Sequence, residues 1–137
     1  MEATVAAVPD LDQQLAAAAR DGYVTCVATL LDSGANCDAT HDLGDPSWAG
    51  RSAVYWAAVG GHLSTFRLLK SAGANVLAPA DSGGTPFMAA CGKGGLQIAR
   101  ELKDAGVDPS ATNNYGRNAV HFAAHGGHLD ILRALRP

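Results

Sequence analysis

The amino-acid sequence predicts an all-α protein, a solenoid of stacked helix-turn-helix units joined by β-turn connections. Two series of short motifs predict this fold, because both recur at the same intervals. In the first series an alanine-rich run ends at a glycine, at positions 22, 61, 94 and 127, which lie 39, 33 and 33 residues apart. The second series shows the intervals 39 and 33 again, in Gly34-Ala35-Asn36, Gly73-Ala74-Asn75 and Gly106-Val107-Asp108. A fixed period of this length is typical of repeat proteins, in which each unit buries its apolar face against its neighbours.

The first helix of each unit is predicted by a short alanine-rich run, as at residues 53–59 and 119–125. Its start is marked by Ser52, Thr85 or Asn118, whose short polar side chains can accept a hydrogen bond from the first turn. The glycine that follows the run is expected to stop the helix and turn the chain. Alanines on this helix allow neighbouring units to approach closely.

The second helix of each unit is predicted by apolar residues at helical spacing, such as Leu63, Phe66 and Leu69. It is expected to end at Gly73 or Gly106, because glycine readily adopts the left-handed conformation that caps a helix. A polar connection rich in Gly, Asp, Asn and Pro then leads to the next unit. The bulkier leucines of this helix are expected to fill the space between units.

Three motifs mark the unit: Gly84-Thr85-Pro86-Phe87 at a helix start, Gly61-His62-Leu63 between two helices, and Leu30-Leu31-Asp32-Ser33-Gly34-Ala35-Asn36 at the end of a unit. As a set, these motifs resemble the ankyrin repeat. Only the third unit keeps the family's Thr-Pro pair, and only the fourth keeps its histidine, His121. The resemblance extends from about Leu11 to the end of the chain.

The resemblance implies one ankyrin-repeat domain over residues 1–137. Its four repeats are expected at about 11–39, 40–78, 79–111 and 112–137, and the first and last are expected to cap the stack. The longer first interval places six additional residues in the connection between Ala39 and Gly50, a finger-like turn of residues 40–50. Trp48 lies in this finger, and two interpretations remain open. Its ring either packs back on the neighbouring finger or anchors a partner.

Residues that could carry chemistry find a structural explanation in the repeat register. His121, His125 and His128 are spaced as metal ligands could be, but His121 and His128 fall on structural positions of the family. The glycines around Lys93 lack the order of a phosphate-binding loop. We therefore expect no catalytic residues, no cofactor and no metal. The three cysteines, Cys26, Cys37 and Cys91, are expected to be small buried side chains in a reducing compartment.

Composition narrows the class of partner and the cellular location. Hydrophobic residues make up 47% of the chain and charged residues 17%, which is typical of a folded domain. The net charge of −3 and the scattered basic residues argue against nucleic acid. No apolar stretch approaches the roughly 20 residues that cross a bilayer. The N-terminus does not read as a signal peptide. We expect an intracellular monomer, cytoplasmic with the nucleus as a second possibility.

By resemblance, the protein is expected to be an interaction module or adaptor without catalysis. Such stacks present a concave surface made of the first helices and the fingers. Carried over residue by residue, the candidate partner-binding positions are Arg20, Trp48, Arg51, Asp81, Lys93, Asn114, Tyr115, Arg117 and His125. Their chemistry predicts a partner segment with acidic and apolar character. Trp56 and Phe122 share one helix position and are expected to belong to the core.

Two other functions remain open at this point. The chain could be the N-terminal regulatory ankyrin fragment of a larger enzyme or channel. It could also bind a small molecule or a metal, which a thermal shift with the ligand would reveal. The sequence names neither the partner nor its pathway.

Overall fold

The structure, a computed structural model, describes residues 10–41, 43–45 and 49–135. Its described part is a succession of helix pairs, numbered here as repeats one to four. The pairs are α1 Leu11–Asp21 with α2 Val24–Asp32, α3 Ala53–Gly60 with α4 Leu63–Ser71, α5 Pro86–Lys93 with α6 Leu96–Asp104, and α7 Ala119–Gly126 with α8 Leu129–Ala134. The all-α, helix-turn-helix prediction is confirmed.

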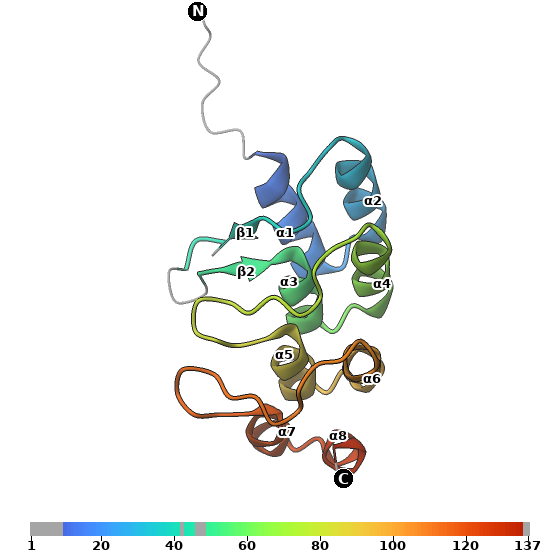
Figure 1. Ribbon diagram of the computed structural model, residues 1–137. Helices are drawn as coiled ribbons and strands as arrows, with labels where there is room; N and C mark the ends of the chain where they lie inside the picture. Colours follow the sequence, from blue (N-terminus) through green and yellow to red (C-terminus); the bar gives the residue numbers. More distant parts are fainter. Residues whose placement is uncertain (1–9, 42, 46–48, 136–137) are drawn as a thin grey trace, which may run out of the picture.

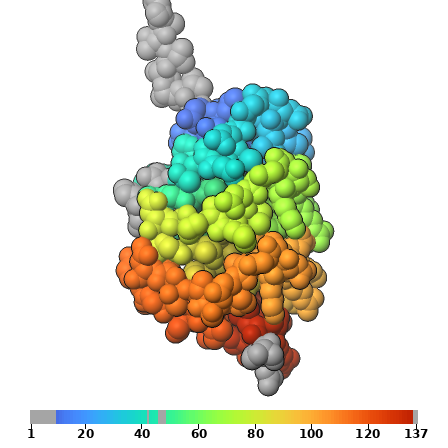
Figure 2. Space-filling view, in the orientation of Figure 1, coloured from blue at the N-terminus to red at the C-terminus, as the bar shows by residue number. Residues whose placement is uncertain are grey.

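The helices form two parallel layers. The first helices α1, α3, α5 and α7 pack on one another in chain order, and the second helices α2, α4, α6 and α8 form the other layer (Figure 1). Each repeat contacts mainly the repeats before and after it, so the repeats appear as successive bands in Figure 2. This is the solenoid that the repeat period predicts.

The finger connections project beyond the first-helix layer (Figure 1). In the longest finger, β1 Thr40–His41 pairs antiparallel with β2 Arg51–Ser52. The shorter fingers are each closed by one hydrogen bond, from Ala80 N to Gly84 O (2.7 Å) and from Asn113 N to Arg117 O (2.8 Å). Further backbone bonds link the fingers in a row, from Asp81 N to Ala49 O (3.1 Å) and from Asn114 N to Ser82 O (2.8 Å). The fingers therefore hold one another in place.

The helix ends behave as the sequence predicts. Ser52, Thr85 and Asn118 each accept a hydrogen bond from the backbone of the first turn. Asn118 makes the most complete cap, because its backbone N also donates to His121 Nδ1 at 3.1 Å. Gly73 follows α4 with φ of 95°, in the left-handed region that favours glycine.

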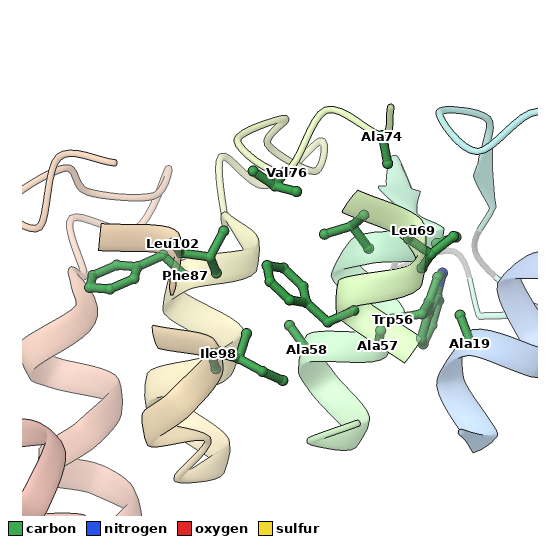
Figure 3. Close-up of a cluster of buried hydrophobic side chains, with 14 of the residues drawn as sticks. Ala19, Trp56, Ala57, Ala58, Leu69, Ala74, Val76, Phe87, Ile98 and Leu102 are labelled. Atoms are coloured by element: carbon green, nitrogen blue, oxygen red, sulfur yellow. The ribbon is translucent and has the colours of Figure 1, made fainter. Parts of the chain in front are cut away.

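The hydrophobic core runs between the two layers through the stack. Its largest members include Phe66 and, labelled in Figure 3, Trp56, Phe87, Leu69, Ile98 and Leu102. Ala19, Ala57 and Ala58 belong to the same cluster and are fully buried, so the first helices pack closely. The prediction that Trp56 belongs to the core is confirmed.

The three cysteines differ in burial. Cys91 is buried as predicted, and burial raises the pKa of its thiol to about 12. Cys37 is half-buried, and burial also raises its pKa, with a further contribution from the Asp38 charge. The prediction is wrong for Cys26, which is exposed. The equivalent positions of later repeats are covered by the preceding repeat, whereas α2 has no preceding neighbour in the described part of the chain.

Candidate protein-binding surface

A groove crosses the outer face of the first-helix layer over repeats two to four. We call it the aromatic groove. It has a volume of about 290 Å3 and is lined by Arg51, Tyr55, Val59, Met88, Ala89, Gly92, Lys93 and Phe122. Because α3, α5 and α7 each contribute side chains, the groove depends on the stacking of three repeats.

Two glycines of the third repeat make room for the aromatic rings of the groove. A Cβ atom on Gly84 would lie 2.9 Å from Tyr55 Oη, and one on Gly92 would lie 3.4 Å from Phe122 Cβ. Tyr55 belongs to the second repeat and Phe122 to the fourth, so both reach toward the third. Because glycine has no side chain, these two positions by themselves would leave a shallow floor. In the structure, aromatic side chains from the neighbouring repeats occupy part of that space.

Arg51 and Tyr55 form one wall of the aromatic groove. The Arg51 guanidinium carbon lies 4.7 Å from the centre of the Tyr55 ring and 5.3 Å from that of Trp56. Cation–π attraction at these distances orients the guanidinium over the rings. Burial raises the pKa of the Tyr55 hydroxyl, and the Arg51 charge opposes part of that rise. Tyr55 therefore presents a neutral hydroxyl at physiological pH.

A second groove adjoins the first at Phe122. We call it the histidine groove. It has a volume of about 290 Å3 and is lined by Arg117, His121, Phe122 and His125. The hydrogen bonds between His121 and Asn118 fix the orientation of one wall. Phe122 thus separates two hollows that differ in chemistry, one aromatic and one with two imidazoles.

The electrostatic character of both grooves is positive. Arg51 and Lys93 line the aromatic groove, and Arg117 lines the histidine groove. Among the residues that the structure describes, neither groove is lined by an Asp or Glu side chain. The whole chain carries a net charge of −3, so the charge of these grooves is opposite in sign to that of the chain.

The first repeat carries a separate hollow of about 310 Å3. Arg20 lines it together with Gln13, Gln14, Ala17, Leu43 and Gly44. The Arg20 guanidinium pairs with Asp21, with 3.1 Å between Nε and Oδ1. Both side chains are well exposed, so this ion pair contributes little to stability. Arg20 therefore lies apart from the two grooves around Phe122.

The finger residues among the predicted contacts fall into two kinds. Asn114 Nδ2 donates to Asp81 O at 3.0 Å, so Asn114 links two fingers. Tyr115 is 77% exposed and points its large side chain into solvent. Trp48 lies outside the described residues. The structure therefore gathers Arg51, Lys93, Arg117 and His125 around Phe122, and leaves Asp81, Asn114 and Tyr115 in the finger row. Partner contact by these residues stays a prediction.

Sequence reasoning missed the aromatic lining of the grooves. Phe122 was expected in the core, and this expectation is wrong, because its side chain is only half-buried. The equivalent Trp56 is covered by the long finger, to which its Nε1 donates at His41 O (3.2 Å). In the part of the chain that the structure describes, no finger of that length covers Phe122. Gly92 occupies in the third repeat the position that His125 occupies in the fourth. Its missing side chain was the sequence signal that could have revealed the space beside Phe122.

The turn histidines have the structural role that the repeat register predicts. His62 Nε2 bonds to Arg20 O at 2.9 Å, and His128 Nε2 bonds to Gly92 O at 3.0 Å. Each imidazole thereby links its own turn to the preceding repeat. Within the described ranges, no group of three or more His, Cys, Asp or Glu side chains is placed to hold a metal ion. In the same ranges, no helix is long and apolar enough to cross a membrane.

A further hollow, of about 560 Å3, lies in the other layer between α6 and α8. Its lining mixes apolar side chains such as Leu96 and Ile131 with the charged residues Arg100, Lys103 and Asp104. Helix α8 has six residues where α6 has nine.

Comparison with known proteins identifies the repeat. Residues 15–69 and 87–136 match the family model for ankyrin repeats (many copies). The chain is 29% identical over 126 residues to the ankyrin repeat and KH domain-containing protein mask-1 of Caenorhabditis elegans. It is 32% identical over 82 residues to palmitoyltransferase AKR1 of Kluyveromyces lactis. It is 37% identical over 68 residues to protein phosphatase 1 regulatory subunit 27 of Homo sapiens.

These alignments cover 91%, 59% and 50% of this chain. They cover only 4%, 11% and 44% of the respective relatives. The similarity is therefore one of the repeat domain and does not extend over the whole relatives.

Proposed function

Because the chain belongs to the ankyrin repeat family, we propose that it is an interaction module, or adaptor, that binds a partner protein. Binding uses the concave surface of the first helices together with the finger loops, and the module has no catalysis of its own. We place it inside the cell, in the cytoplasm or the nucleus, and as a monomer before it binds. Ankyrin repeats imply protein partners, and one relative is described as a regulatory subunit.

The pair of grooves on either side of Phe122 is the observation that carries this proposal. Together they offer two aromatic rings, a thioether and several cations within one continuous surface. Aromatic and arginine side chains contribute most to protein interfaces, because they combine large contact area with directed polar groups. An enclosed catalytic site would instead need converging acid, base or nucleophile groups, and these grooves supply none in that arrangement.

Affinity capture with matched variants tests the proposal. The bait is the full chain, beside a groove variant with Lys93→Glu and Phe122→Ala. The control variant carries Lys70→Glu and Leu129→Ala, an equivalent pair of changes on exposed residues of the second-helix layer. All three must show the same helical circular dichroism and cooperative thermal unfolding before use.

The expected result is a protein retained by the unchanged chain and by the control, and lost from the groove variant. Equal retention by all three would contradict binding through the grooves. Loss from the control alone would place the interface on the second-helix layer.

A second candidate function is regulation within a larger enzyme. The observation in its favour is the similarity to a palmitoyltransferase of which this chain matches only 11% of the length. Immunoblotting of source cells with an antibody raised against the chain would distinguish the two functions. A band near the 14.0 kDa of the chain supports a separate adaptor, whereas a much heavier band supports the regulatory fragment.

A further inference from the structure

We propose that the partner of the two grooves is an extended acidic segment with one apolar anchor residue, whose carboxylates lie on both sides of the anchor. This inference rests on the proposed function and specifies the chemistry of the ligand. The anchor would pack against Phe122 in the aromatic groove. The flanking carboxylates would meet Lys93 on one side and Arg117 on the other.

The anchor site follows from the lining of the aromatic groove. Phe122 and Tyr55 line this hollow from the repeats on either side of the third, and Met88 and Ala89 of the third repeat line it too. The volume of about 290 Å3 suits one large apolar side chain. Gly92 keeps the site open, because any side chain there would project against Phe122.

The flanking charges follow from the positions of two exposed cations. Lys93 ends α5 in the third repeat, and Arg117 precedes α7 in the fourth. They line different grooves and share Phe122 as a neighbour, and no acidic side chain of the described residues lines either groove. The surface around Phe122 is therefore positively charged, although the whole chain carries a net charge of −3. Complementary charge of this kind selects an acidic ligand and steers its approach.

The geometry also sets the spacing in the ligand. Neighbouring helices of a layer pack about 10 Å apart, and a helix of eight residues is about 12 Å long. Lys93 and Arg117 lie at opposite ends of neighbouring first helices, so their backbones are about 16 Å apart by this estimate. An extended chain advances about 3.3 Å per residue. Two carboxylates about five residues apart, with the anchor between them, therefore match the surface.

A protein segment fits these observations better than a nucleic acid does. Nucleic-acid binding needs many cations to neutralise a continuous row of phosphates. Here a few cations surround an apolar hollow, which a polynucleotide backbone cannot fill. A single-stranded oligonucleotide is nevertheless a useful competitor, because its bases could stack on Phe122.

The test is a selection of random dodecapeptides displayed on phage, using the immobilised full chain. A selected peptide is then synthesised, and its dissociation constant is measured for the unchanged chain, for Lys93→Glu with Arg117→Glu, and for the control Arg133→Glu at an exposed position of α8. A second peptide has its two carboxylates replaced by lysine. A fluorescent 20-nucleotide single strand serves as the nucleic-acid probe.

The expected peptides carry Asp or Glu about five residues apart around Leu, Ile, Met, Phe or Trp. The double reversal should weaken binding at least about 30-fold, the control should change it less than about threefold, and the lysine peptide should prefer the reversed chain. Selected peptides without acidic residues, or equal binding to the reversed chain, would overturn the inference and leave the proposed function intact.

Two further outcomes also decide against it. A selection without binding clones, while lysate capture succeeds, would show that the ligand is not a short linear segment. Tight binding of the oligonucleotide that the same reversal abolishes would replace the acidic protein with nucleic acid.

Discussion

At the residue scale, the candidate surface depends on two positions that carry no side chain. Gly84 and Gly92 leave space that Tyr55 and Phe122 enter from the repeats on either side. Gly92 lies inside α5 and has an ordinary helical backbone. Glycine destabilises a helix at such a position, and here no positive φ requires it. Its small size instead opens the aromatic groove. This is a property of one residue that no neighbouring repeat shares, since Val59 and His125 occupy the equivalent positions.

Filling this space should separate binding from stability. We expect Gly92→Leu to weaken partner binding at least about tenfold, because the new side chain occupies the anchor site against Phe122. The free energy of unfolding should stay within about 1 kcal/mol of the unchanged chain, since better helix propensity offsets the tight contact. Binding titration and urea unfolding measure the two effects. Gln97→Leu, at an exposed position of α6, is the control and should leave both unchanged. Unaltered binding by Gly92→Leu would contradict the anchor site.

Cysteine reactivity offers a second test at this scale. At pH 7.5 iodoacetamide should label Cys26 readily, because that residue is exposed. Cys91 should remain unlabelled in the folded chain, because it is buried and its thiol has a pKa of about 12. Peptide mass spectrometry after timed labelling reads out each site, and labelling in urea serves as the reference. Equal rates for Cys26 and Cys91 in the folded chain would contradict the described packing.

At the element scale, the inter-helix turns of repeats two and four connect each of these repeats to the one before it. His62 reaches the carbonyl of Arg20, and His128 reaches that of Gly92, each through Nε2. The ring of His62 lies so close to Gly22 that a Cβ atom there would be 2.6 Å from its Nδ1. Gly22 also has φ of 77°, so glycine is required there both for space and for conformation.

Removing one of these turn contacts should destabilise the stack measurably. We expect His62→Ala to lower the free energy of unfolding by about 1–2 kcal/mol, through the lost hydrogen bond and the unsatisfied carbonyl. The same substitution at exposed His125 should change it by less than about 0.5 kcal/mol. Urea unfolding followed by circular dichroism compares the two variants. A similar small effect at both positions would show that the turn contact is not needed.

The elements were easier to predict from sequence than the surface they form. The alanine runs at 53–59 and 119–125 became α3 Ala53–Gly60 and α7 Ala119–Gly126, because local helix capping and periodicity determine them. The pairing of β1 with β2 and the exposure of Phe122 depend on which finger covers which helix. That is a contact between segments far apart along the chain, and a repeat pattern carries no information on it.

At the scale of the whole molecule, stability depends on position in the stack. Val54, Phe87 and Val120 occupy equivalent positions in successive repeats. The first two are 0% and 2% exposed, whereas Val120 is 45% exposed because no further repeat covers it in the described structure. Nearest-neighbour packing of this kind is what makes a repeat protein stable.

One substitution at two equivalent positions tests this dependence. Val54→Ala should lower the free energy of unfolding by about 2 kcal/mol, through lost apolar burial and the cavity that remains. Val120→Ala should cost about 0.5 kcal/mol or less, since its side chain stays largely in contact with water. Equilibrium unfolding in urea distinguishes the two. Equal costs would mean that the fourth repeat is covered in solution by something else.

Charge is the other property that belongs to the whole molecule. The chain has three lysines, of which Lys93 lies on the aromatic groove and Lys70 and Lys103 lie on the second-helix layer. Lys70 and Lys93 are both exposed, so a reagent in solution reaches them equally in the unbound protein. A bound partner reduces the labelling of lysine on the layer that it covers and leaves lysine on the other layer accessible.

Lysine footprinting therefore tests the central claim most directly. The chain is acetylated briefly, alone and with its captured partner, and peptide mass spectrometry compares the labelling of Lys93 with that of Lys70. Binding through the first-helix layer predicts strong protection of Lys93 and unchanged labelling of Lys70. Protection of Lys70 with unchanged Lys93 would place the partner on the opposite layer and contradict the claim.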